Sequence, residues 1–147
     1  GVHPYLSVGA TADGGIGAAE LTVPARTELV VDGGLPTGAR RPFDGAVGRL
    51  GDRALDTPLT DLDRDDGGHA HVRLVGDAGA LDLAVDRSWP WLQVYTGDAL
   101  PPGQRRRSLA VEPMTSPPNA LADGVDLVVL PPGGSWSGSW ELRWTPA

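Results

Sequence analysis

Glu112 is a candidate general base. It follows the apolar run 109–111 in the stretch LAVEPMTSPPNA, and Pro113 comes directly after it. A carboxylate at the end of a buried strand costs free energy unless it is paired or used. The prolines at the exit, which include the pair Pro117–Pro118, would hold the acid in one place at low entropic cost. A general base needs such fixed placement.

The neighbours of Glu112 fit a catalytic role, although a structural role stays open. In a strand, Glu112 shares a face with Ser108 and Ala110, whose small side chains leave room for a ligand. The alternative is an ordinary glutamate that pairs with one of Arg105–Arg107. On the local pattern alone this structural alternative is the commoner case.

Two histidines and several aspartates could bind a metal ion. His69 and His71 would lie on one face of a strand, but two ligands are too few for a closed site, and Asp65 or Asp66 would have to complete it. The stretch DLDRDDGG begins like a calcium loop, yet it lacks the glycine at the sixth position and the glutamate at the twelfth. We therefore expect no metal site here and interpret the histidines as exposed residues at the entrance of a hairpin.

These side chains must be positioned by strands, because glycine and proline are too frequent for long helices. The chain has 21 Gly and 14 Pro, and runs such as HVRLV and LDLAV alternate with a period of two. The pattern predicts an all-β antiparallel sandwich with no helix longer than a turn. Strands are expected near residues 27–32, 70–75, 80–86, 91–96, 107–112, 125–130 and 138–144. Loops are expected at 35–42 and across the charged region 40–68.

Composition limits the class of protein. The 147 residues suffice for a single domain, 1–147, with a hydrophobic core. The net charge of −7 argues against nucleic acid and anionic membranes as partners, since both are polyanions. There is no cysteine, so neither a disulfide nor thiolate chemistry is expected. No apolar run is long enough to span a membrane and no signal peptide is visible, and we expect a cytoplasmic location. Because the first residue is Gly1, the chain either lost an initiator methionine or begins part-way through a longer product.

Five segments resemble one known family. LAVEPMTSPPNALADGVDLVVLPPGGSWSGSW is similar to the C-terminal signature of the aldose 1-epimerase (galactose mutarotase) family. GVHPYLSVG resembles its His-Pro-Tyr segment, LPTG its Pro-Thr-Gly turn, LDTPLTDL its Leu-Asp segment and WLQVYTGD its Gln-Val-Tyr-Thr-Gly strand. The five segments occur in the family's order over nearly the whole chain, which makes the match specific although each one alone is weak.

The resemblance implies a fold, an activity and a set of site residues. The fold would be the galactose mutarotase-like β-sandwich, with an open cleft for a free aldohexose such as glucose or galactose. The activity would be interconversion of the α and β anomers, without a cofactor. Glu112 matches the family's catalytic base and His3 its general acid. Asp56 matches a sugar-binding aspartate, and Gln93 and Tyr95 lie on a strand that would line the cleft.

The chemistry explains these residue types. Ring opening removes a proton from the anomeric hydroxyl O1 and delivers one to the ring oxygen O5, tasks that suit a carboxylate and an imidazolium. The unperturbed pKa of histidine, about 6.5, lets both proton states be visited near neutrality. We expect His3 and Glu112 to open into one concave surface, with Asp56 at its rim and with room for a pyranose ring between acid and base.

The chain departs from the family in length. Family members are about twice as long, so this chain resembles the C-terminal half of a mutarotase, and its sandwich should be incomplete. We expect the missing N-terminal half on a separate chain or segment, and exposed strand edges and apolar surface where it would dock. The alternative function is a non-catalytic carbohydrate-binding module. Tryptophans could stack on sugars, but at alternate strand positions Trp140 and Trp144 are more often part of the core.

Overall fold

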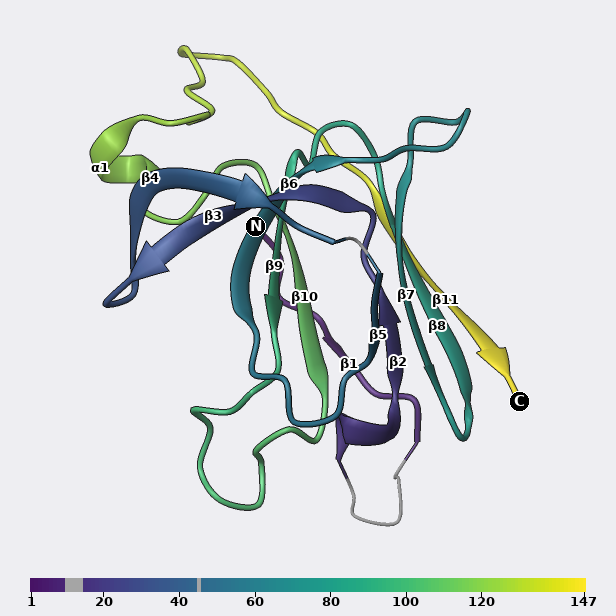
Figure 1. Ribbon diagram of the computed structural model, residues 1–147. Coiled ribbons are helices and arrows are strands. Elements are labelled where there is room, and N and C mark those ends of the chain that lie inside the picture. The colour runs from purple at the N-terminus through teal and green to yellow at the C-terminus, as the bar shows by residue number, and fades with distance from the viewer. Residues whose placement is uncertain (10–14, 45) are drawn as a thin grey trace.

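The computed structural model describes residues 1–9, 15–44 and 46–147. Within these ranges the chain is built of antiparallel strands that form two sheets (Figure 1). In spatial order, the first sheet contains β1 (Tyr5–Leu6), β10 (Leu109–Met114), β9 (Trp91–Tyr95), β6 (Asp56–Leu62), β3 (Ala25–Asp32) and β4 (Leu35–Pro42). The second sheet contains β11 (Trp140–Pro146), β8 (Gly79–Val85), β7 (Ala70–Gly76), β2 (Glu20–Thr22) and β5 (Ala46–Arg49).

The hydrophobic core lies between the two sheets. Along β7 the even-numbered residues Val72 and Leu74 are fully buried, whereas the alternating His71 and Arg73 are exposed, as a strand with one covered face requires. One continuous cluster joins side chains of both sheets, among them Leu21, Val72, Leu74, Leu83, Val85, Leu59, Leu92, Val94, Leu109 and Val111. The predicted all-β antiparallel sandwich is therefore confirmed.

Most of the predicted strands are present, with shifts of a few residues at their ends. The predicted strands 27–32, 70–75, 80–86 and 91–96 correspond to β3, β7, β8 and β9, and the predictions at 107–112 and 138–144 to β10 and β11. The expected absence of long helices also holds for the described residues, where α1 (Ala120–Asp123) and the 3-10 turn η1 (Ile16–Ala18) are short. None of these helices is long and apolar enough to cross a membrane.

Two predictions of local structure are wrong. Residues 35–42, expected to be a loop, form β4, which pairs with β3 after the turn at Gly33–Gly34. The region 40–68 likewise contains β5 and β6, although residue 45 lies outside the described residues. β4 is an edge strand, where prolines are tolerated because half of its backbone groups need no partner.

The predicted strand at 125–130 is also absent, because no neighbouring strand pairs with this segment in the described structure. Its apolar side chains lie partly in solvent, with Val129 77% and Leu130 50% exposed. A strand needs a partner for its backbone hydrogen bonds, which the sequence of the segment alone cannot supply.

Candidate active site

Glu112 lies on the outer face of the first sheet. On β10 the residues Leu109 and Val111 point into the core and are fully buried, so Glu112 points to the opposite side. Its side chain remains 17% exposed. The face predicted for Glu112 is therefore confirmed, and strand pairing on both sides of β10 fixes its position.

His3 is in direct contact with Glu112. The Nε2 atom of His3 lies 3.0 Å from Oε1 of Glu112. The segment that carries His3 runs beside β10, because the backbone N–H of Val2 donates to the carbonyl of Pro113 and that of Val111 donates to the carbonyl of Pro4. Two residues 109 positions apart in the sequence thus become neighbours.

This contact bears on the structural alternative for Glu112, a pair with one of the arginines 105–107. The arginines 105–107 bond elsewhere: Arg106 pairs with Asp98 at 2.9 Å, and the other two donate to carbonyls of their own loop. Glu112 is therefore not the arginine-paired strand end that the local pattern allowed. The expectation of a pyranose-sized space between acid and base is also wrong, because the two side chains touch in the described structure.

Burial raises the pKa of Glu112 above its usual range, since the ionised carboxylate is poorly solvated there. The positive charge of His3 works against this shift, the negative charge of Asp56 adds to it, and the N-terminal ammonium group also opposes it. A carboxylate with a raised pKa is a stronger base than an exposed one, which suits general-base chemistry near neutral pH.

The other predicted site residues share the outer face of the same sheet. The strand register places Asp56, Tyr95 and Ala110 in one row, and Gln93 beside Glu112 in the next. Gln93 donates from Nε2 to Oδ1 of Asp56 at 2.5 Å. Its Oε1 atom is buried and has no hydrogen-bond partner among the described residues. A buried acceptor without a partner costs free energy, so the packing around Gln93 is unfavourable for its amide oxygen.

These residues do not form the single concave surface that was expected. The hollow beside His3 and Glu112 has a volume of about 300 Å³ and is otherwise lined by Gly1, Val2, Met114, Thr115 and Ser116. Asp56 lines a different hollow, of about 180 Å³, with Glu28, Leu29, Val30, Val31, Arg41, Thr57 and Pro58. The contacting pair of His3 and Glu112 therefore lies on the same sheet face as Asp56 but in a separate hollow, whose volume is at the lower end of the range for ligand pockets.

The chain resembles known proteins in sequence and in fold. A sequence model of the family described as aldose 1-epimerase matches residues 1–143. The chain belongs to the aldose 1-epimerase family. The structure is similar to the crystal structure of a GalM/aldose epimerase homologue from C. elegans, with a TM-score of 0.72 and 21% sequence identity. At this identity the likeness shows the fold alone, and it confirms the predicted mutarotase-like sandwich.

The chain spans half the length of this solved relative of the aldose 1-epimerase family. The structural match covers 99% of the chain and 50% of the C. elegans chain. A curated relative is the uncharacterized protein YihR of Escherichia coli strain K12, which is 44% identical over 54 residues. That match covers 37% of this chain and 16% of YihR.

Tyr5 is a neighbour of His3 that the sequence did not single out. Its ring stacks on the imidazole of His3, with centroids 4.9 Å apart and an angle of 28° between the planes. Burial raises the pKa of the Tyr5 hydroxyl, and the charges of Tyr95 and Glu112 raise it further. The signal was present, because residues 3 and 5 of an extended segment share a face.

The loop after β10 forms one wall of the hollow beside His3 and Glu112 and is attached to β9 by a hydrogen bond. Thr115 and Ser116 line the hollow. Further along, Asp126 accepts a hydrogen bond of 2.9 Å from the indole nitrogen of Trp91. Trp91 is 1% exposed and also carries the guanidinium of Arg40 over its ring, at 5.3 Å. The sequence did not reveal this anchor, since its partners are 35 residues apart.

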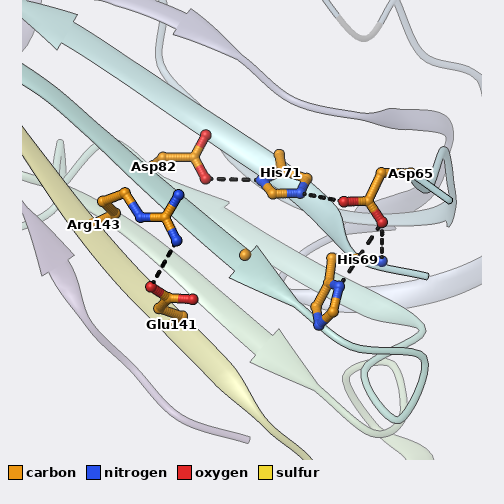
Figure 2. A pocket seen from close by; sticks show the side chains of 7 residues that line it. Asp65, His69, His71, Asp82, Glu141 and Arg143 are labelled. Atoms are coloured by element: carbon orange, nitrogen blue, oxygen red, sulfur yellow. Dashed lines mark hydrogen bonds and ion pairs between the residues drawn. The ribbon is translucent and has the colours of Figure 1, made fainter. Parts of the chain in front are cut away.

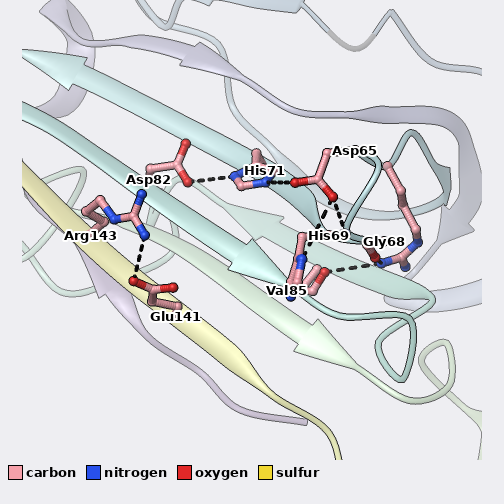
Figure 3. A network of polar contacts seen from close by, with 9 residues as sticks. Asp65, Gly68, His69, His71, Asp82, Val85, Glu141 and Arg143 are labelled. Carbon is pink, nitrogen blue, oxygen red and sulfur yellow. Dashed lines mark hydrogen bonds and ion pairs between the residues drawn. The ribbon is translucent and has the colours of Figure 1, made fainter.

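The two histidines considered as metal ligands lie on the second sheet, away from Glu112. They line a hollow of about 300 Å³. Figure 2 shows the side chains around it. His71 lies between two carboxylates, with Nδ1 at 2.8 Å from Asp82 and Nε2 at 3.0 Å from Asp65 (Figure 3). The hydrogen bond to Asp82 and that to Asp65 raise the pKa of His71, although burial lowers it.

The ring nitrogens of these histidines face carboxylates in the described structure. Both ring nitrogens of His71 are occupied by carboxylates, and His69 lies 3.8 Å from Asp65. Among the described residues no three His, Cys, Asp or Glu side chains are arranged to hold a metal ion. The exposed entrance of the β7–β8 hairpin is the better description of these histidines.

Proposed function

We propose that this chain contributes the acid–base pair that interconverts the α and β anomers of a free aldohexose. The observation that carries the proposal is the 3.0 Å contact between His3 and Glu112 beside an open hollow, in a member of the aldose 1-epimerase family. The raised pKa of Glu112 supports its role as base.

In this mechanism the carboxylate of Glu112 takes the proton of the anomeric hydroxyl O1. The C1–O1 bond becomes a carbonyl while the C1–O5 bond breaks, and O5 takes a proton from Nε2 of His3. Rotation about C1–C2 then presents the other face of the aldehyde. Reclosure returns the O5 proton to His3 and the proton of Glu112 to O1.

The contact between acid and base is compatible with this chemistry. O1 and O5 are both bonded to C1, so neighbouring side chains on one side of the sugar can reach both oxygens. The pair therefore does not need to flank the whole ring. We propose that the polar side chains of Gln93, Asp56 and Tyr95, which share this sheet face, bind other hydroxyls of the sugar. Such contacts would hold the ring still during the reaction.

We further propose that a complete cleft requires polypeptide that this chain does not contain, on a separate chain or segment. The support is that the chain covers 50% of the solved relative and that its site hollow is small and open. A non-catalytic carbohydrate-binding module is the second candidate, and the same two observations favour it for the chain alone.

The test is Glu112→Gln in an assembly that holds both halves of the fold. The amide can still hydrogen-bond to O1 but cannot accept its proton, so kcat should fall by about 10²- to 10⁴-fold with little change in KM. The measurement is polarimetry of freshly dissolved α-glucose or α-galactose, with the uncatalysed rate subtracted. Full activity of the variant would remove Glu112 as the base. Sugar binding without any catalysis by the unmodified assembly would favour the binding module.

A further inference from the structure

The edge strand β11 carries apolar side chains that lack a cover. β11 lies at the end of its sheet with β8 as its strand neighbour in the described structure, and Figure 1 shows it in yellow along the outer margin. Trp140, Leu142 and Trp144 are 41%, 42% and 45% exposed. In register they lie opposite the buried residues Val85, Leu83 and Leu81. The core-facing layer of this sheet therefore continues beyond the part that the other sheet covers.

The backbone of β11 is also open for pairing. Beside β8, the backbone N–H of Asp86 donates to the carbonyl of Ser139 at 3.1 Å, and that of Ala147 donates to the carbonyl of Ala78 at 3.0 Å. The odd-numbered residues of β11 thus direct their N–H and C=O groups toward β8. The even-numbered Trp140, Leu142 and Trp144 direct theirs outward. A long edge with free backbone groups and an apolar face is a template for a further strand.

We propose that two copies of this chain associate through β11 about a two-fold axis at Leu142. An antiparallel pair in this register sets Leu142 opposite Leu142 of the second copy, with both backbone hydrogen bonds exchanged between them. It sets Trp140 opposite Trp144 of the second copy on the core-facing side. Pro146, which has no N–H, limits the ladder at its end.

The charges of β11 select a second copy as the occupant. Glu141 and Arg143 lie on the outward face of β11, where they form an ion pair of 3.0 Å (Figure 2). In the two-fold register, Glu141 of each copy lies opposite Arg143 of the other, as a closely spaced pair that is not hydrogen-bonded through the backbone. A two-fold interface must be self-complementary. In this register β11 meets that condition, because each glutamate faces an arginine and each Trp140 faces a Trp144. The proposal does not depend on the sugar chemistry, because Glu112 lies in the other sheet.

The test combines two charge variants of the full chain. In homodimers, Glu141→Arg sets two arginines opposite each other at both contacts, and Arg143→Glu sets two glutamates opposite each other. Each variant alone should weaken the dimer by about tenfold or more. A mixture of the two variants restores opposite charges at both contacts and should recover the dimer. Sedimentation equilibrium measures the dissociation constants, and circular dichroism checks that each variant is folded.

The control is Arg49→Glu on β5, at the opposite edge of the same sheet. It makes the same charge change as Arg143→Glu and should leave the dimer unchanged. An unmodified chain that stays a monomer would overturn the proposal and leave the β11 face to a different polypeptide. A dimer insensitive to both variants would show that association uses another surface. Two monomeric variants that fail to pair on mixing would overturn the two-fold register.

Discussion

At the scale of residues, the site depends on a few side chains whose neighbours change their chemistry. Glu112 accepts a contact from His3, and His3 in turn stacks on Tyr5. Glu112 could be selected from the sequence because a charged residue ended an apolar run beside prolines. Its contact with His3 could be expected only from the family resemblance, since no local pattern joins positions 3 and 112. Gln93 was selected too, but its unpaired Oε1 depends on packing that no sequence pattern reports.

The raised pKa of Glu112 predicts a pH-dependent effect on stability. A carboxyl group whose pKa is raised above its ordinary 4.5 in the folded state binds its proton more tightly there. Its stabilising contribution is present at low pH and is lost as the pH rises through the folded-state pKa. The ionised group therefore destabilises the fold at neutral pH. We expect Glu112→Gln to raise the melting temperature at pH 7, and the difference to shrink below pH 4.5. A variant that melts lower at both pH values would contradict this linkage.

Tyr5 is predicted to position His3 through ring stacking. Tyr5→Leu should remove the stacked face and let the imidazole leave its orientation toward Glu112, whereas Tyr5→Phe should keep it. The measurement is the pair of ¹⁵N shifts of the His3 ring, together with contacts between the two rings in nuclear Overhauser spectra. In an active assembly, Tyr5→Leu should lower kcat more than it raises KM. Equal effects of the leucine and phenylalanine variants would point to the hydroxyl instead.

At the scale of elements, pairing decides which segments become strands. The alternation of β7 and β8 was visible in the sequence, because one face of each strand contacts the core. β4 was missed because all the residues Leu35–Pro42 are exposed or half-buried, so no apolar period marks them. The segment 125–130 was predicted to be a strand but does not form one. It has the composition of a strand, but the described residues supply no neighbour for it.

The connection after β6 depends on one arginine. Arg64 donates from Nη1 to the carbonyls of Gly68, Val85 and Asp86 and from Nη2 to that of Trp89, at 2.9–3.2 Å. These contacts join the loop to the end of β8.

Arg64→Met would remove the guanidinium from these four carbonyls, of which that of Asp86 would keep the backbone N–H of Trp89. We expect it to lower the free energy of unfolding by about 2–4 kcal/mol. Arg64→Lys should give an intermediate loss, because one ammonium group reaches fewer of the carbonyls. Urea unfolding measures the change, and Arg49→Met on the exposed edge strand β5 is the matched control. A loss no larger than that of the control would show that water replaces the guanidinium at little cost.

At the scale of the whole molecule, the chain has a continuous core, whereas the hollows at its predicted site residues are small. The sandwich buries a continuous apolar cluster between its sheets, which explains why the fold class could be predicted from alternation alone. The shape of the site could not be predicted in this way, because the walls of a cleft are formed by loops and strands that are distant in sequence. The depressions beside Glu112 and Asp56 stay separate in the described structure.

The 147-residue chain on its own should therefore be inactive or only weakly active as a mutarotase. Without further walls the sugar would be held by few groups and would stay hydrated, so the pair of His3 and Glu112 would act on a poorly oriented substrate. Polarimetry of α-galactose with the isolated chain is the measurement, and Glu112→Gln in the same chain gives the background. Full activity of the isolated chain would show that the further polypeptide proposed above is not needed.

The tryptophans differ in burial, so their intrinsic fluorescence reports on two regions of the molecule separately. Trp89 and Trp91 are 5% and 1% exposed, whereas Trp136, Trp140 and Trp144 are between 39% and 45% exposed. Emission from the first group should be blue-shifted and shielded from iodide, and emission from the second red-shifted and readily quenched. A partner that covers β11 would change only the emission of the exposed tryptophans. Unfolding of the core would instead shift the emission of Trp89 and Trp91. One emission spectrum can thus separate assembly from unfolding without any added dye.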